Sequence, residues 1–205
     1  MAVTLVLVRH GETEGNSSIR YYGATDIALS EIGRLQMRSV RRELERRTIG
    51  AFATVFASPL SRAIESARVI TSGNPSITPI EEFREINFGL FEGLTAEEIR
   101  ERYPQAYRHW MADRFAPDFT FPEGDNRRAF TERVHRGLDR MLAMIDDAPP
   151  SDGYVLLVAH RGVIRTIVER LTNESPAVEL ASIQILLRAS DWQPQALDLT
   201  DHLRP

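Results

Sequence analysis

Five side chains of this sequence could together perform acid, base or nucleophilic chemistry. His10 and His160 each follow directly after a short apolar run, and Arg9 precedes the first of them. Arg62 lies in the first turn of a segment with helical spacing, and Glu85 lies in a stretch without regular periodicity. Two arginines can hold the oxygens of a phosphate while an imidazole attacks the phosphorus without a metal ion. A histidine after a strand is also often structural, and spacing alone does not decide between these interpretations.

The elements that must position these residues alternate between strands and helices. Residues 3–8 and 154–159 are continuous apolar runs, typical of strands covered on both faces, and residues 53–57 form a third strand-like run. Helices are predicted after Ser30, after Ser58–Pro59, after Thr95, over 127–145 and over 163–171. This order predicts an α/β fold of three layers, with helices on both faces of a mainly parallel central sheet. Ligands are expected beyond the carboxyl ends of the strands, where both histidines are predicted.

The helix after Ser30 is expected to bury one apolar stripe. The residues assigned to that stripe are Ile32, Leu35, Val40 and Leu44. The helix predicted after Thr95 is expected to stop near Pro104.

The composition limits the classes of function. The chain has 205 residues, is 42% hydrophobic and has no apolar run long enough to cross a bilayer, which predicts one domain in a cytoplasmic protein that does not bind membranes. Because it has no cysteine, disulfides, thiol nucleophiles and thiolate metal sites are excluded. The formal net charge of −4 gives the whole protein no electrostatic attraction to nucleic acid. All 25 basic residues are arginines, which excludes lysine chemistry such as a Schiff base.

Several blocks of the sequence resemble one known family. LVLVRHGETEGN (5–16) closely resembles the signature of the histidine phosphatase superfamily, also called phosphoglycerate mutase-like proteins, which carry an Arg-His-Gly triplet after the first strand. The resemblance continues through residues 23–34, ASPLSRAIESA (57–67), REINFGLFEG (84–93) and VLLVAHRGVIR (155–165), so that it spans about four-fifths of the chain. It implies a phosphoglycerate mutase-like fold with a single domain over residues 1–205, in which an excursion at about 85–126 covers the active site.

The resemblance also implies a role for each of the five side chains. His10 is expected to attack phosphorus as a neutral imidazole whose other ring nitrogen donates to a backbone carbonyl. Arg9, Arg62 and His160 are expected to surround the phosphoryl oxygens, where charge collects in the transition state. Glu85 is expected to protonate the leaving alcohol oxygen and then to deprotonate the water that attacks phosphohistidine. These roles imply neither a metal nor a cofactor.

Further positions are expected to contact the substrate. Asn16 resembles a donor to a phosphate oxygen, and Gly23 lies where the family's loop passes the substrate. Arg161 stands where the family usually has a second glycine, so its side chain either points into solvent or extends the anion pocket. Tyr21–Tyr22 is expected to pack against the core rather than to floor the pocket.

The sequence therefore predicts a metal-independent phosphomonoesterase that passes the phosphate of a small phosphorylated metabolite to His10 and then to water. The main alternative is a mutase, which would return the phosphate to the substrate's other oxygen, although cofactor-dependent mutases tend to be longer. A phosphoprotein substrate and a non-catalytic phosphate sensor are further alternatives, but sensors usually lose the nucleophile or an arginine. An exposed face could pair two copies into a homodimer.

Overall fold

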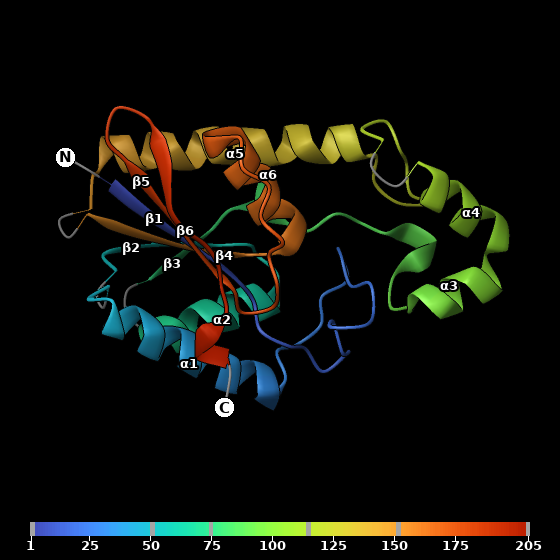
Figure 1. The fold of residues 1–205 in the computed structure, drawn as a ribbon, viewed down its shortest axis with the longest axis horizontal. Helices are drawn as coiled ribbons and strands as arrows, with labels where there is room; N and C mark the ends of the chain where they lie inside the picture. Colours follow the sequence, from blue (N-terminus) through green and yellow to red (C-terminus); the bar gives the residue numbers. More distant parts are fainter. Residues whose placement is uncertain (1–2, 50–51, 74–75, 114–115, 151–152, 204–205) are drawn as a thin grey trace.

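One mixed sheet forms the centre of the molecule (Figure 1). The computed structural model describes residues 3–49, 52–73, 76–113, 116–150 and 153–203, and in these residues six strands lie in the order β3-β2-β4-β1-β5-β6. The strands are β1 (Val3–Arg9), β2 (Thr54–Ala57), β3 (Ile77–Pro79), β4 (Tyr154–Ala159), β5 (Ile183–Arg188) and β6 (Trp192–Leu199). The pairs among β1 to β4 are parallel, whereas β5 is antiparallel to both of its neighbours. The predicted mainly parallel sheet is confirmed, and the two C-terminal strands extend it beyond the elements that the sequence predicted.

Helices cover both faces of this sheet, as Figure 1 shows. The α-helices are α1 (Glu31–Arg46), α2 (Ser61–Thr71), α3 (Ala96–Arg102), α4 (Pro104–Ala112), α5 (Arg127–Asp147) and α6 (Arg161–Thr172), and the short 3-10 helices are η1 (Glu81–Phe83), η2 (Gly89–Phe91) and η3 (Asp201–Leu203). Because successive strand residues point to opposite faces, Leu5 and Leu7 of β1 lie in the core under α5 and α6, while Val6 and Val8 lie in the core under α1 and α2. No helix within the described ranges is both long and apolar enough to span a membrane.

The helix predicted after Ser30 is present, but its buried face differs from the prediction. Ser30 caps α1, since its hydroxyl accepts a hydrogen bond from the N–H of Gly33 at 3.1 Å. Ile32 and Leu35, which were assigned to the buried stripe, are 62% and 53% exposed. The residues that α1 buries are Gly33, Met37, Val40 and Leu44. These four buried residues follow one another at intervals of three to four and so define one face of the helix. Ile32 and Leu35 lie outside that face, so the prediction for them was wrong.

The helix after β2 begins later than the sequence predicted. Ser58 was expected to cap it with Pro59 as its first residue, but α2 begins at Ser61 and its N-cap Leu60 makes no side-chain capping bond. The hydroxyl of Ser58 is instead buried at the end of β2, where its Oγ lies 2.7 Å from Nε2 of His160. The capping prediction was wrong because the chain turns before the helix begins: the hydroxyl of Ser58 accepts from the N–H of Leu60 at 3.3 Å, ahead of α2, and also contacts a histidine that is distant in sequence.

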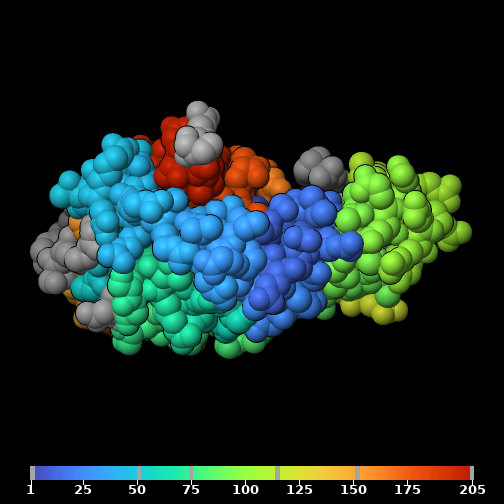
Figure 2. Space-filling view, turned by 90° about the horizontal axis from the view of Figure 1, so that it is seen from below, coloured from blue at the N-terminus to red at the C-terminus, as the bar shows by residue number. Residues whose placement is uncertain are grey.

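α3 and α4 form a lobe that extends from one end of the molecule (Figure 1). Thr95 caps α3 in a capping box with Glu98, as predicted in part from sequence, whereas Pro104 begins α4 instead of only ending α3. In Figure 2 the lobe (green) lies beside the loop that follows β1 (blue). Tyr21 of that loop stacks edge-on against Trp110 of α4, with ring centroids 5.4 Å apart. The proposal that residues 85–126 cover the active site stays a prediction.

Candidate active site

The parallel register of β1 and β4 brings the two predicted histidines together. Arg9 of β1 pairs with Ala159 of β4, so the next residue of each strand is a histidine. The N–H of His10 donates to the carbonyl of Ala159 at 3.1 Å, and the imidazole centroids of His10 and His160 are 5.1 Å apart. β2 lies on the other side of β4 and contributes Ser58 from its own carboxyl end. Three neighbouring strand ends therefore form one buried polar cluster.

The surroundings of His10 determine its protonation state. Nδ1 lies 2.7 Å from the carbonyl oxygen of Gly11, an acceptor, so Nδ1 carries the proton. Nε of Arg62 donates to Nε2 of His10 at 3.3 Å, so Nε2 presents its lone pair. Burial first, and then the charges of Arg62 and Arg9, lower the pKa of His10 well below 6.5. His10 is consequently a neutral imidazole at neutral pH, with the lone pair on Nε2.

Backbone groups hold the buried guanidinium of Arg62. Its Nη1 donates to the carbonyl of Thr25 at 2.8 Å, and its Nη2 donates to the carbonyl of Gly23 at 2.7 Å. The carboxylate of Glu92 holds this loop in turn, because it accepts hydrogen bonds from the N–H groups of residues 23, 24 and 25 at 3.1 to 3.3 Å. A chain of contacts thus runs from Glu92 through the loop to Arg62 and on to His10.

Arg9 and His160 each keep one buried nitrogen without an acceptor or donor among the described residues. These atoms are Nε of Arg9 and Nδ1 of His160. Nη1 of Arg9 donates to the carbonyl of Val178 at 2.9 Å, and burial is the main cause that lowers the pKa of Arg9 to about 10. Burial and the neighbouring charges, with Arg62 the largest of these, lower the pKa of His160 well below 6.5. Arg9 therefore remains charged at neutral pH while His160 is neutral.

Glu85 is buried against the N-terminus of α6. Its Oε2 accepts from the N–H of Gly162 at 2.8 Å, and its Oε1 accepts from the N–H of Ile86 at 3.0 Å. A Cβ on Gly162 would lie 2.5 Å from Oε1, so only glycine allows this approach. Burial raises the pKa of Glu85, although these N–H groups and the nearby arginines oppose the rise. The carboxyl group therefore holds its proton to a higher pH than an exposed glutamate.

A cavity of about 290 Å³ opens onto three of these groups, while Arg62 and His160 do not belong to its described lining. Arg9, His10 and Glu85 lie in its wall, and further lining residues are Ser17, Ser18, Ile19, Arg20, Tyr21, Tyr22, Phe88, Arg161, Glu179 and Leu180. Among the described residues, no three histidine or carboxylate side chains lie together in a way that could hold a metal ion. The positive charge at this cavity comes from arginines. Such a pocket can bind a phosphate next to a nucleophile and a proton donor.

The family model of the histidine phosphatase superfamily (branch 1) matches residues 5–190. The chain belongs to this family. It is 32% identical over 190 residues to a bifunctional protein of Mycobacterium tuberculosis, a match that covers 88% of this chain and 49% of that one, so the chain spans about half the length of this relative. It is 31% identical over 207 residues to a metal-independent phosphoserine phosphatase of Arabidopsis thaliana, covering 97% of this chain and 82% of that one.

The fold of this histidine phosphatase superfamily member is also found in a solved structure. The alpha-ribazole phosphatase from Shigella flexneri matches it with a TM-score of 0.80 at 23% sequence identity, and the match covers 96% of each chain. At this identity the comparison shows the phosphoglycerate mutase-like fold and no more.

The three residues predicted to contact the substrate differ in their placement. Arg161 is exposed and belongs to the lining of the cavity, and its charge is one of those that lower the pKa of Arg9, while the contact of its guanidinium with a substrate stays a prediction. Gly23 acts through its backbone on Arg62, and a Cβ there would lie 1.8 Å from the carbonyl oxygen of Ile86. Asn16 is exposed with a φ of 59°, and the described lining of the cavity includes the next residues, Ser17 and Ser18, but not Asn16. The structure therefore does not bring the side chain of Asn16 into this cavity.

Tyr21 packs against the core as the sequence predicted, but contrary to the prediction both Tyr21 and Tyr22 also lie in the wall of the cavity. Tyr21 packs against Phe88 with ring centroids 5.5 Å apart.

Ser58 and Glu92 are the residues that sequence reasoning missed. Ser58 fitted a local capping pattern, and its contact with His160 depends on the pairing of β2 with β4. Glu92 lies within the family-like block 84–93, but its hydrogen bonds to residues 23–25 join segments about seventy residues apart, which no local pattern can indicate.

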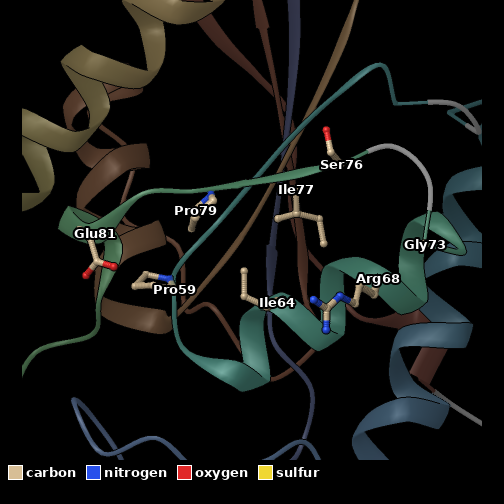
Figure 3. Close-up of a pocket in the computed structure, with 8 residues that line it drawn as sticks. All are labelled: Pro59, Ile64, Arg68, Gly73, Ser76, Ile77, Pro79 and Glu81. Atoms are coloured by element: carbon tan, nitrogen blue, oxygen red, sulfur yellow. The ribbon is translucent and has the colours of Figure 1, made fainter.

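A second, larger cavity lies away from these groups, between α2 and β3 (Figure 3). Its volume is about 550 Å³, and its lining consists of Pro59, Ile64, Arg68, Gly73, Ser76, Ile77, Pro79 and Glu81. In Figure 3 the two charged side chains, Arg68 and Glu81, lie at opposite ends. No histidine belongs to this described lining, so the smaller cavity is the candidate site.

Proposed function

We propose that this protein is a metal-independent phosphomonoesterase in which His10 takes the phosphoryl group covalently. The observation that carries the proposal is the neutral imidazole of His10, which presents the Nε2 lone pair beside Arg62 and lines the same cavity as Arg9 and Glu85. Membership of the histidine phosphatase superfamily and the similarity to a metal-independent phosphoserine phosphatase support it.

In the first half-reaction, Nε2 of His10 attacks phosphorus and the bond between phosphorus and the leaving alcohol oxygen breaks. Glu85 gives its proton to that oxygen, which its raised pKa favours. The guanidinium groups of Arg9 and Arg62 and the imidazole of His160 hold the phosphoryl oxygens as their charge develops. The Nδ1–H bond to Gly11 stabilises the positive ring of the phosphorylated His10.

In the second half-reaction, the carboxylate of Glu85 removes a proton from water as the water oxygen attacks phosphorus. The bond between Nε2 of His10 and phosphorus breaks, inorganic phosphate leaves, and Glu85 is protonated again. One carboxyl group thus supplies and recovers a single proton in each turnover, so no other acid or base is needed.

The cavity favours a small phosphorylated metabolite as the substrate. Its volume of about 290 Å³ lies at the lower end of the range of roughly 300–1,000 Å³ that is typical of small-molecule sites. A phosphate and a leaving group of a few atoms would fill it. The segment 85–126 contributes Glu85 and Phe88 to the wall, which supports its proposed role as a cover of the site.

Hydrolysis of p-nitrophenyl phosphate in excess EDTA tests the proposal. We expect turnover that EDTA does not reduce, and we expect His10→Ala to lower kcat at least about a thousandfold. His109→Ala is the matched control, because His109 is an exposed histidine on α4, and it should behave as the wild type. Acid-labile phosphate on His10 after rapid quenching would identify the intermediate directly.

Three results would contradict the proposal. They are full activity in His10→Ala, loss of activity in EDTA, and no hydrolysis of any small phosphomonoester. Retention of labelled phosphate on the substrate, instead of its release into solution, would favour the mutase alternative.

A further inference from the structure

In the protein without a bound anion, the positive charge of Arg161 lies in an electrostatically unfavourable position. It is the first residue of α6, a helix of 12 residues, where the positive end of the helix dipole repels a cation. It also lines the same cavity as Arg9. Burial is the main cause that lowers the pKa of Arg9 to about 10. Glu85 opposes this shift, and the positive charge of Arg161 adds to it. Two guanidinium groups therefore repel each other across the cavity.

Arg161 forms no ion pair with any described side chain. Its guanidinium takes part in none of the hydrogen bonds or ion pairs between the described residues. Arg20, another arginine of the cavity wall, is by contrast paired with Glu98, with Nη1 and Oε2 2.6 Å apart. Glu179 is the one acidic side chain besides Glu85 in the described lining. With Arg20 paired and Glu85 protonated, Arg9 and Arg161 give the described lining two positive charges against the single negative charge of Glu179, so the lining has a net positive charge.

We propose that Arg161 binds a second anionic group on the leaving alcohol, so that the enzyme selects phosphomonoesters that carry a carboxylate or a second phosphate near the ester. This inference rests on the proposed function. In the proposed reaction, Arg9 and Arg62 hold the reacting phosphate and the leaving oxygen faces Glu85. A group a few bonds beyond that oxygen would still lie in the cavity that Arg161 lines. A planar guanidinium suits both anions, because it can donate two parallel hydrogen bonds to either.

The small cavity volume sharpens this inference. Because the cavity volume of about 290 Å³ is at the lower end for small-molecule sites, a long or bulky leaving group would have to extend out of it. The second anionic group should therefore be separated from the ester oxygen by only one to a few carbon atoms.

The test compares pairs of phosphomonoesters in which one member carries a second anionic group and the other member lacks it. Phosphoglycolate and ethyl phosphate form one pair, and 1,3-propanediol bisphosphate and propyl phosphate form the other, with p-nitrophenyl phosphate as the reference. kcat/KM is measured for the wild type, for Arg161→Gln and for Arg165→Gln. Arg165 is the matched control because it lies one turn along α6 and pairs with Glu169 at the surface. Thermal unfolding of each variant shows whether it is folded.

We expect the wild type to prefer the anionic member of at least one pair. We expect Arg161→Gln to lower kcat/KM for that member about 10- to 100-fold more than for the neutral member or for p-nitrophenyl phosphate, the range for a lost hydrogen bond to a charged group. The pair that responds tells whether the group is a carboxylate or a phosphate. Arg165→Gln should leave both ratios unchanged.

The inference is wrong if the wild type prefers the neutral member of both pairs, a result that does not depend on any variant. It is also wrong if Arg161→Gln changes both members of each pair equally. Hydrolysis of p-nitrophenyl phosphate separates the two proposals, since its absence in the wild type would refute the phosphomonoesterase itself, whereas normal hydrolysis without charge selectivity would refute only the role of Arg161.

Discussion

Glu92→Gln should disturb the candidate active site although Glu92 does not line the cavity. The two carboxylate oxygens accept hydrogen bonds from four backbone N–H groups, those of residues 23, 24, 25 and 88. A glutamine side chain has the same shape but replaces one oxygen with an NH2 donor. If its oxygen stays near Gly23, Ala24 and Phe88, the N–H of Thr25 faces the new donor. The opposite orientation leaves more N–H groups facing it.

The expected loss of stability follows from these contacts. A backbone donor that loses its partner costs about 1–3 kcal/mol when buried, and Thr25 is exposed, so the lower part of that range applies. The remaining bonds also lose their charge assistance. We therefore expect about 1–2 kcal/mol, which corresponds to a fall in Tm of about 2–8 °C for a protein of this size.

Activity should fall as well as stability, because the loop holds Arg62. The carbonyls of Gly23 and Thr25 accept from the two terminal nitrogens of its guanidinium. Loss of one donor to a transition-state oxyanion costs about 100- to 1,000-fold in kcat, so partial displacement of Arg62 should cost about tenfold. Arg62 also helps to keep the pKa of His10 low, after burial, so the acidic limb of the kcat/KM profile should move to higher pH.

The assays are thermal unfolding and the pH dependence of kcat/KM for p-nitrophenyl phosphate. Glu45→Gln is the matched control, because Glu45 forms an exposed i,i+4 pair with Arg41 that should contribute less than about 0.5 kcal/mol. Glu92→Gln with the Tm and pH profile of this control would refute the reasoning. A lower Tm with an unchanged pH profile would show that Glu92 stabilises the loop without positioning Arg62.

Three further predictions follow from the buried groups. Ser58→Ala removes the partner of Nε2 of His160, so it should lower stability by about 1–2 kcal/mol in urea unfolding and change the tautomer signals of that ring in ¹⁵N NMR spectra. Glu85→Gln should slow the hydrolysis of an alkyl phosphate about 100-fold or more, but should slow that of p-nitrophenyl phosphate less, because nitrophenolate leaves without a proton. In the wild type, kcat/KM should fall as the pH rises through the raised pKa of Glu85, and Glu85→Gln should not show this fall. The pKa values of His10 and His160 are lowered in the folded state, so below pH 6.5 the unfolded state binds more protons than the folded state. The contribution of these groups to the free energy of unfolding should therefore be fully present above pH 6.5 and be lost as the pH falls. Urea unfolding at several pH values would measure this loss, which should be smaller in His10→Gln.

The parts of the site that the sequence predicts correctly are those that follow from strand ends. The apolar runs before His10 and His160 predict two buried strands, and β1 and β4 occupy these positions. In a parallel sheet such ends meet at one edge, so the proximity of the two histidines could be expected before the register was known. Arg62 and Glu85 could be assigned only through the resemblance to the family, because neither follows a strand end directly.

The parts that the sequence does not predict depend on long-range contacts. Ile32 and Leu35 are apolar, yet the pairing of α1 with the sheet selects a face through Gly33, Met37 and Val40 instead. The two C-terminal strands lacked a distinct signal, and β6 contains Pro194, which a strand at the sheet edge tolerates.

Burial has opposite effects on the groups of the candidate site, and each effect is the one that the proposed reaction needs. It disfavours the charged form of every group, so it lowers the pKa of His10 and keeps the nucleophilic lone pair, and it raises the pKa of Glu85 and keeps the proton for the leaving oxygen. The same burial lowers the pKa of Arg9 only to about 10, so that guanidinium stays charged at neutral pH. An arginine tolerates this environment where a lysine would tend to lose its proton. Burial is thus a single physical cause that prepares the nucleophile, the acid and the cation of the proposed reaction.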